Sequence, residues 1–522
     1  MKSSLTIICI VITSSFWCRA GLGVGWFEEL WKSFSFLFGV WTLLKISKLF
    51  STKFILFLAL LVLLASAGIY FKIHNATWKS PNAKNLESLD YQTIIASMPN
   101  PQNSIFITDA LQKIIFFANE NPHNSLALQF HFKNLSAEKF KQSEGLDRIF
   151  KKIVVCTWKY PSPFLPTLAV ATNDFLGRIL YFIAQLFIGV IVYFAFQKRK
   201  EIRQFTGYLL FGITILAIVG IWQKFSYSPS VEGKEILGIW NTPEPRYFYA
   251  SFTYKNHWSA LAILFISVCI ALFFSLSSRN EGKLKTLLLA VSFFSILCSI
   301  PHSGSRSGVL IVMTLFVLSL LVFLRRIKLK AVRFKLFPIL IILTGAVFVG
   351  LMLNKNTTKE MINNSVLQMQ SDTKPLRFYL WADLLEQISK KTFWGFGYNS
   401  YEAINPIFQS KQVREMREIG LEYSHKKYIP LVAHGHSDIL ESISEFGWIG
   451  FSTIFLPFFF IILRNFIYSK SEFVKMLSAG CLCLIIYCCI DFPTRTPACL
   501  IAFSTLVGLS MKYDKLTKDC IL

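Results

Sequence analysis

Apolar stretches long enough to cross a lipid bilayer recur along this chain, and they restrict the folds that it can adopt. A transmembrane helix needs about 20 mainly apolar residues, and the 522-residue sequence has twelve candidate segments. Charged residues make up only 16% of the sequence, whereas soluble domains use about 25%. We therefore predict an all-α, polytopic membrane protein with about twelve transmembrane helices. The predicted spans are 4–18, 30–46, 54–72, 175–196, 206–225, 257–277, 284–301, 307–325, 336–353, 437–463, 475–491 and 497–511.

The distribution of positive charge predicts the orientation of these spans. The short connectors on one side hold 22 Lys and Arg residues but only four acids, which supplies +18 of the net charge of +24. Short loops rich in Lys and Arg stay in the cytoplasm, so both termini are predicted to be cytoplasmic. The basic excess is thus a signal of topology, and nucleic acid is not an expected partner. The connectors are 45–53, 198–203, 279–285, 325–335, 464–475 and the tail 512–518.

This topology divides the chain into five predicted regions, and it places residues 226–256 in a further outer loop. The N-terminal segment also fits a second interpretation, because the apolar residues 5–17 followed by Cys18 and Ala20 resemble a cleavable signal peptide. The five regions are N-terminal transmembrane helices (1–72), a periplasmic insert (73–174), further transmembrane helices (175–353), a long periplasmic loop (354–436), and C-terminal transmembrane helices with a cytoplasmic tail (437–522).

Ionisable residues near the outer ends of spans are candidates for chemistry, because lipid excludes charge unless it faces a cavity or a partner. Arg306 follows a run of small residues where a predicted span begins. Arg377 shares one helical face with Trp381 and Leu385, so that helix is predicted to lie on the membrane surface with its Arg facing inward. The alternatives are an interfacial Arg that reaches the headgroups and an ordinary amphipathic helix.

A histidine-rich segment leads from the long loop into the tenth predicted span. It contains His434, His436 and Asp438, with Glu445 further along. A histidine there is suited to act as a general base, and Glu445 is suited to orient a partner or to pair with an Arg. Two alternatives remain: interfacial polar residues without a catalytic role, and a zinc site formed by the two histidines and Asp438. The spacing of those three residues matches no usual helical metal motif.

Two further polar positions lie at predicted span ends. Asn256 stands where the sixth span begins, and Asp491 separates the last two spans. Each residue is placed either to line a cavity or simply to mark the end of a helix.

The order and spacing of these motifs over about 245–510 resemble the O-antigen ligase / O-antigen polymerase family. Its histidine signature is His, then Asn, Ser or Gln, nine residues, Gly, two residues, and Gly, Thr or Val, as in 436–450 here. Residues 304–308 are similar to its Ser-Arg turn, and Asn256 to the Asn that opens an earlier span. Arg377 and Trp381, followed by the Gly-Phe-Gly of 395–397, resemble its loop helix. The insert 73–174 departs from the family pattern.

The resemblance implies transfer of a glycan from undecaprenyl diphosphate to an acceptor hydroxyl at the periplasmic face of the bacterial inner membrane. The acceptor is lipid A-core in ligases, another repeat unit in polymerases, and a protein in a related branch. No metal or other cofactor is expected. Arg306 and Arg377 would bind the diphosphate through paired hydrogen bonds, and His436 would take the acceptor proton, with inversion. The remaining expected substrate contacts are Asn256, Trp381, Glu445 and Asp491.

A transporter or flippase for a lipid-linked oligosaccharide is the alternative from another class. Such a protein would use a similar basic and aromatic cavity. It should also show paired repeats with broken helices near the bilayer midplane. The sequence contains no such internal repeat, and its polar candidates gather at one predicted face.

Overall fold

A computed structural model describes about half of the chain, which forms two compact units. Unit 1 comprises 1–50, 180–372 and 456–522, and unit 2 comprises 51–179 and 373–455. The described residues are 2–21, 28–34, 36–37, 78–79, 170–171, 175–225, 235–237, 239–241, 247–277, 283–324, 375–401, 405, 408, 410, 412–413 and 434–520. The predicted spans 54–72 and 336–353, most of 30–46, and nearly all of the insert 73–174 lie outside these residues.

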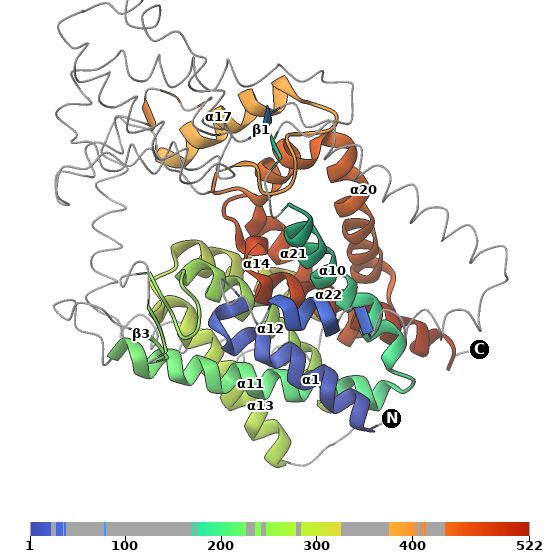
Figure 1. The fold of residues 1–522 in the computed structure, drawn as a ribbon. Helices are drawn as coiled ribbons and strands as arrows, with labels where there is room; N and C mark the ends of the chain where they lie inside the picture. Colours follow the sequence, from blue (N-terminus) through green and yellow to red (C-terminus); the bar gives the residue numbers. More distant parts are fainter. Residues whose placement is uncertain are drawn as a thin grey trace, which may run out of the picture. The chain divides into compact units, whose positions relative to one another are not determined.

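Among the described residues the regular secondary structure is helical apart from four strands of two residues each, which confirms the predicted all-α class (Figure 1). Strand β1 (Trp78–Lys79) pairs in parallel with β2 (Val170–Ala171), and β3 (Glu235–Ile236) pairs antiparallel with β4 (Trp240–Asn241). The helices are α1 (Lys2–Trp17), η1 (Arg19–Gly21), α10 (Phe175–Ala195), α11 (Arg199–Phe225), α12 (Lys255–Ser277), α13 (Lys283–His302), α14 (Arg306–Leu324), α17 (Leu376–Lys390), α20 (Asp438–Tyr468), α21 (Glu472–Cys488), η4 (Pro493–Arg495) and α22 (Pro497–Lys518).

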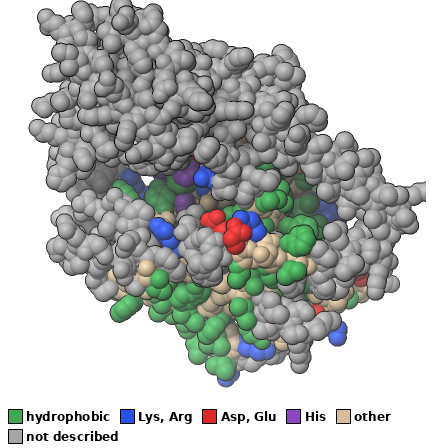
Figure 2. All heavy atoms as spheres, in the orientation of Figure 1, with side chains coloured by type: hydrophobic (Ala, Val, Ile, Leu, Met, Phe, Trp, Pro, Cys, Tyr) green, Lys and Arg blue, Asp and Glu red, His purple; other side chains and the backbone are tan. Residues whose placement is uncertain are grey.

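Five of the described helices are long and apolar enough to cross a membrane. Two shorter apolar segments, Ile8–Trp17 and Arg306–Val322, add to them. Hydrophobic side chains cover much of the described surface in Figure 2. Helix α11, for example, exposes Phe211 and Trp222. Exposed apolar side chains on apolar helices indicate that lipid surrounds this protein. The five segments are Arg178–Ala195, Arg199–Phe225, Lys255–Leu276, Lys283–His302 and Asp438–Tyr468.

Helix α12 forms the centre of unit 1. It packs against α11, α13, α14, α21 and α22, and most of its side chains are buried. Its apolar residues surround the whole helix, as expected for a helix that is enclosed by others. The close approach of α21 requires a glycine, because a Cβ on Gly480 would collide with the side chain of Ser267 in α12.

The N-terminal helix α1 is also a packed element of unit 1. It contacts α11 and α22, and its Ile8, Ile12 and Phe16 side chains are fully buried. The Phe16 ring meets Phe265 of α12 edge to face at 5.6 Å. The hydroxyl of Ser251 donates a hydrogen bond to the Phe16 carbonyl. The first predicted span therefore contributes to the same core as the later helices.

Hydrogen bonds bring three predicted cytoplasmic connectors together at one end of unit 1. The Arg203 guanidinium donates to the Tyr513 hydroxyl at 2.9 Å, which joins the start of α11 to the end of α22. The Ser469 hydroxyl donates to Asp514 Oδ1 at 2.6 Å, which joins the α20–α21 connector to the same helix end. The starts of α12 and α14 and the segment after α21 meet elsewhere in this unit, around Asn256.

Unit 2 contains α17 and the first part of α20. Helix α17 buries the stripe that includes Leu380 and Leu384. The face predicted to turn inward at the membrane surface is the more exposed one within the protein, with Leu385 57% exposed, and its direction relative to the membrane stays a prediction. The predicted span 437–463 is not one continuous helix, because Gly447 has φ 68° and ψ 173° and breaks α20. The residues before Gly447 are mostly polar and those after it mostly apolar, and the prediction took both parts as one span.

Candidate active site

The backbone around His436 is fixed on both sides in unit 2. His436 lies in the turn before α20 with φ 54°, a left-handed conformation that residues other than Gly rarely adopt. The indole Nε1–H of Trp381 donates to the His436 carbonyl at 3.2 Å. On the other side, the Gly435 N–H donates to Glu441 Oε2 at 2.9 Å. Helix α17 and helix α20 thus hold the histidine turn between them.

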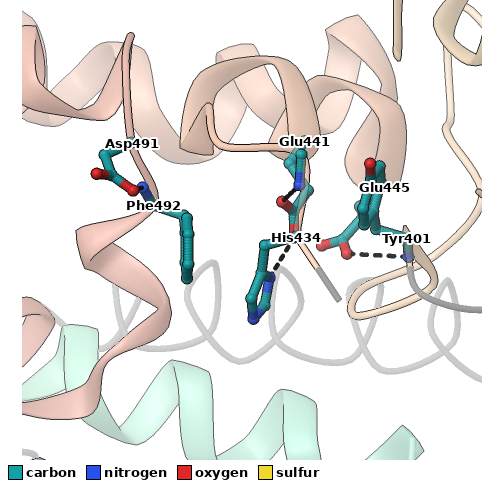
Figure 3. A network of polar contacts seen from close by, with 7 residues as sticks. Tyr401, His434, Glu441, Glu445, Asp491 and Phe492 are labelled. Atoms are coloured by element: carbon teal, nitrogen blue, oxygen red, sulfur yellow. Dashed lines mark hydrogen bonds and ion pairs between the residues drawn. The ribbon is translucent and has the colours of Figure 1, made fainter. Parts of the chain in front are cut away.

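Glu441 is the central acceptor of this turn. Its carboxylate is 1% exposed, and its Oε1 lies 3.1 Å from Nδ1 of His434 (Figure 3). One carboxylate therefore contacts both residues that precede His436. Sequence reasoning gave Glu441 no role. The signal was available, because residues at the start of a helix reach back to the preceding turn.

Ser437, the residue after His436, is the N-cap of α20. Its hydroxyl accepts the Leu440 N–H at 3.3 Å, and its carbonyl accepts the Glu441 N–H at 2.9 Å. These are the contacts of a helix N-cap, a position that favours Ser, Thr, Asn and Asp. The signature residue after His436 therefore starts α20.

The Gly-Phe-Gly segment caps the broken end of α20. The N–H groups of Phe396 and Gly397 donate to the carbonyls of Ser444 and Glu445 at 2.9 and 2.8 Å. Carbonyls in the last turn of a helix have no partner within the helix. The loop supplies those partners at the point where Gly447 ends the first half of the helix.

The same loop also satisfies the start of the second half of α20. The N–H groups of Trp448 and Ile449 donate to the carbonyls of Thr392 and Phe393 at 2.9 and 3.1 Å. A Cβ on Gly447 would collide with the Phe393 backbone. A Cβ on Gly395 would similarly collide with the backbone of the helix. The two glycine motifs found in the sequence therefore form one interlocked structure.

Glu445 lies in the interior of unit 2. Its side chain is fully buried, and its Oε1 accepts the Tyr401 N–H at 3.4 Å (Figure 3). The neighbouring Ser444 hydroxyl donates to Gln387 Oε1 at 3.1 Å, and Gln387 Nε2 donates to Asn405 Oδ1 at 3.4 Å. Sequence reasoning missed Gln387, because a polar residue on an amphipathic helix is normally assigned to its solvent face, and it gave Asn405 of the long loop no role. A direct substrate contact by Glu445 remains a prediction.

Arg377 lies on α17, one turn before Trp381, and its side chain is partly exposed. The Phe378 ring packs edge to face on Trp381 at 5.4 Å. Because Trp381 bonds to the histidine turn, the structure brings the helix that carries Arg377 to His436 within unit 2. The buried Asp383, also missed, accepts two hydrogen bonds from Ser410 and holds part of the long loop against α17.

Arg306 is the first residue of α14 in unit 1, and its side chain is exposed. The Ser305 hydroxyl accepts the Gly308 N–H at 3.1 Å and caps the helix. Gly304 has φ 78°, which lets the chain turn sharply before the cap. The guanidinium therefore adds its charge to a helix N-terminus, whose free N–H groups already favour anions.

The structure brings Asn256 and Asp491 together beside this turn. Asn256 Nδ2 donates to Asp491 Oδ2 at 2.5 Å, and Asn256 Oδ1 accepts the Ser305 hydroxyl at 2.8 Å. The exposed fractions are only 5% for Asn256 and 1% for Asp491. The Asp491 Oδ1 also accepts the N–H of Phe492 (Figure 3). Both residues thus make contacts inside the protein, and their predicted substrate contacts remain a prediction.

Among the described residues, no three His, Cys, Asp or Glu side chains gather as metal ligands would. The zinc alternative formed by His434, His436 and Asp438 therefore has no such cluster to support it. Metal independence itself remains a prediction.

A family model described as O-antigen ligase matches residues 290–456. The matched segment includes Arg306, Arg377, His436 and the Gly447 break, whereas Asn256 and Asp491 lie outside it. The match confirms the resemblance that the motifs indicated. No curated protein matches the chain.

Proposed function

The match over residues 290–456 identifies an O-antigen ligase domain in this chain, and on that premise we propose a metal-independent, inverting glycosyltransferase. The glycan moves from an undecaprenyl diphosphate carrier to an acceptor hydroxyl at the periplasmic face. The observation that best supports this function is the clamped His436 turn inside the matched segment.

His436 is the proposed general base. The acceptor oxygen attacks the anomeric carbon as its proton passes to the imidazole. The bond from that carbon to the diphosphate oxygen breaks, and the leaving diphosphate keeps the electron pair. Attack opposite the leaving group inverts the configuration. Fixing the base before the substrate arrives lowers the barrier, because no ordering is then needed during the reaction.

Arg306 and Arg377 are the proposed partners of the leaving diphosphate. A planar guanidinium binds a phosphate through two parallel hydrogen bonds, which an ammonium cannot reproduce. Charge on the leaving group grows as its bond breaks, so fixed positive groups stabilise the transition state most. For Arg306 the N-terminus of α14 adds to this effect. The polyprenyl tail would remain among membrane lipids along the apolar helices.

We assign the protein to the bacterial inner membrane, with twelve spans, both termini in the cytoplasm and the five regions defined from the sequence. The joining of three basic connectors at one end of unit 1 supports this orientation. A single Cys at Ser410 and one at Ser471, each in a background without other accessible thiols, should label from opposite sides with an impermeant reagent. Labelling of both from the same side would refute the topology.

The acceptor decides the finer function. Lipid A-core is the proposed acceptor, and a growing polysaccharide or a protein hydroxyl is the alternative within the family. Purified protein should be incubated with a lipid-linked glycan and each acceptor in turn, and the masses of the products should be measured by mass spectrometry. Glycan attached to lipid A-core supports a ligase, and a lengthened glycan supports a polymerase. Glycan that stays on its carrier but crosses a vesicle membrane would support a flippase instead.

A further inference from the structure

Two serines flank Arg306, and one buried tyrosine hydroxyl contacts both. Tyr487 is in the last turn of α21 and is fully buried. Its hydroxyl oxygen lies 3.2 Å from Ser305 Oγ and 2.9 Å from Ser307 Oγ. Sequence reasoning gave Tyr487 no role, because a tyrosine in an apolar span is usually part of the packing.

The donors and acceptors of this network can be assigned from the number of hydrogens that each group carries. Asn256 presents its amide nitrogen to Asp491, since its oxygen would repel the carboxylate there, and the second amide hydrogen reaches the Tyr254 hydroxyl at 3.0 Å. The Asn256 oxygen therefore accepts the single hydroxyl hydrogen of Ser305. This leaves Ser305 able only to accept from its other partners.

The remaining directions follow from that assignment. Tyr487 must donate its hydrogen to Ser305, so Ser307 must donate its own to Tyr487. The chain of hydrogen bonds thus runs from Ser307 through Tyr487, Ser305 and Asn256, and it ends on the carboxylate of Asp491. Ser307 Oγ also lies 3.5 Å from Ser305 Oγ, a longer contact than the 2.9 Å to Tyr487. The loss of the Tyr487 hydroxyl therefore leaves Ser305 without a donor and Ser307 without its shorter acceptor. Such a network holds one geometry.

We propose that Tyr487 is a positioning residue that fixes the Arg306 guanidinium where it binds the donor diphosphate. The inference rests on the function proposed for Arg306. Ser305 and Ser307 hold the backbone on both sides of the arginine, and Ser305 also caps its helix. Tyr487 ties both serines to α21, so the exposed arginine side chain extends from a backbone that is held in place.

The test uses Tyr487→Phe, which removes one oxygen and keeps the ring. Binding of undecaprenyl diphosphate in nanodiscs should weaken about 5- to 10-fold, the size of one lost hydrogen bond. In an Arg306→Ala background the same substitution should change Kd by less than about twofold, because Tyr487 acts through the arginine. Tyr513→Phe is the matched control. Its buried hydroxyl accepts a hydrogen bond from Arg203 near the C-terminal end of α22, in the cluster of predicted cytoplasmic connectors. Binding of undecaprenyl diphosphate by this variant should stay at the wild-type value.

A second variant keeps the test decisive if Tyr487→Phe lowers the yield of folded protein. Ser307→Ala removes the donor to the Tyr487 oxygen at a more exposed position, and it should weaken binding with the same dependence on Arg306. Equal weakening by Tyr487→Phe with and without Arg306 would overturn the positioning role, as would unchanged binding in the presence of Arg306. If Arg306→Ala itself left binding and transfer intact, the proposed function of Arg306 would fail first.

Discussion

Glu441 offers a sharp test of how the histidine turn is held, because its one carboxylate contacts both residues that precede His436. Glu441→Ala removes the acceptor of the Gly435 N–H, whose nitrogen lies 2.9 Å from Oε2, and the contact to His434 at 3.1 Å. A buried donor left without a partner costs about 1–3 kcal/mol. If that energy holds the turn in its active geometry, its loss lowers the equilibrium constant between the active and the displaced turn about 5- to 150-fold, and turnover should fall with it.

The assay is the transfer rate at saturating donor and acceptor, with donor Kd and the thermal midpoint Tm measured in parallel. Glu441→Gln retains an oxygen for the Gly435 N–H and should stay within about fivefold of wild type. The exposed Glu386 on α17 provides a control, and Glu386→Ala should have no effect. If Glu441→Ala transferred glycan at the wild-type rate, the proposal that Glu441 holds the histidine turn would be refuted. Turnover in Glu441→Gln as low as in Glu441→Ala would show that charge matters and that the backbone bond does not.

Three further substitutions test other parts of the structure. Gly447→Ala should lower Tm and abolish most transfer, because φ 68° and the collision with the neighbouring loop both disfavour a Cβ; Gly450→Ala, where φ is ordinary, should be mild. Arg306→Lys should restore little of the transfer lost in Arg306→Ala, since an ammonium lacks the two-pronged contact; near-full activity would contradict the diphosphate role. Phe16→Ala should destabilise unit 1 by about 3–5 kcal/mol in unfolding measurements, and the exposed Ile10→Ala should leave stability unchanged.

Much of the helical layout was predictable because lipid-spanning helices leave a simple pattern in the sequence. The span predicted at 175–196 appears as α10, and that at 257–277 appears as α12. The boundaries agree because Lys, Arg and small polar residues stop the apolar runs. The start of α14 at Arg306 was predictable for the same reason.

The break in α20 was not predicted. Six of the ten residues in 437–446 are polar, so the apolar run begins only after Gly447. Polar residues at the end of a span and glycines inside membrane helices are both common, however, so neither feature by itself indicates a break. What breaks the helix is the loop that includes Phe396 and Gly397, which approaches its backbone. Such contacts between distant segments leave no periodic signal. Only the two glycine motifs pointed to this place, and they did so separately.

The candidate site was predicted by residue type better than by orientation. His436 and Trp381 do lie together, joined by a hydrogen bond. The face of α17 that packs inside unit 2 was not predicted, because it includes Asp383 and Gln387, which are polar yet buried. Their partners come from the long loop and from α20, so no pattern within α17 indicates their burial. Tyr487 was missed for a related reason, since its partners lie about 180 residues away.

The most direct test of the proposed catalysis is the transfer rate of His436 variants, measured together with donor binding. His436→Asn is the sharper variant, because Asn tolerates the positive φ of this position better than Ala does. Both His436→Asn and His436→Ala should bind lipid-linked glycan as wild type does. Both should transfer it about 10²- to 10⁴-fold more slowly, the usual effect of losing a general base.

Wild-type transfer should fall as the pH is lowered, because a protonated imidazole cannot accept a proton, and a chelator should change nothing. His434→Ala should be far milder than His436→Ala, since Glu441 retains its bond to Gly435. Bound donor without transfer in the His436 variants is the result that the account predicts. Substantial transfer by His436→Asn, or loss of wild-type activity on chelation, would contradict it.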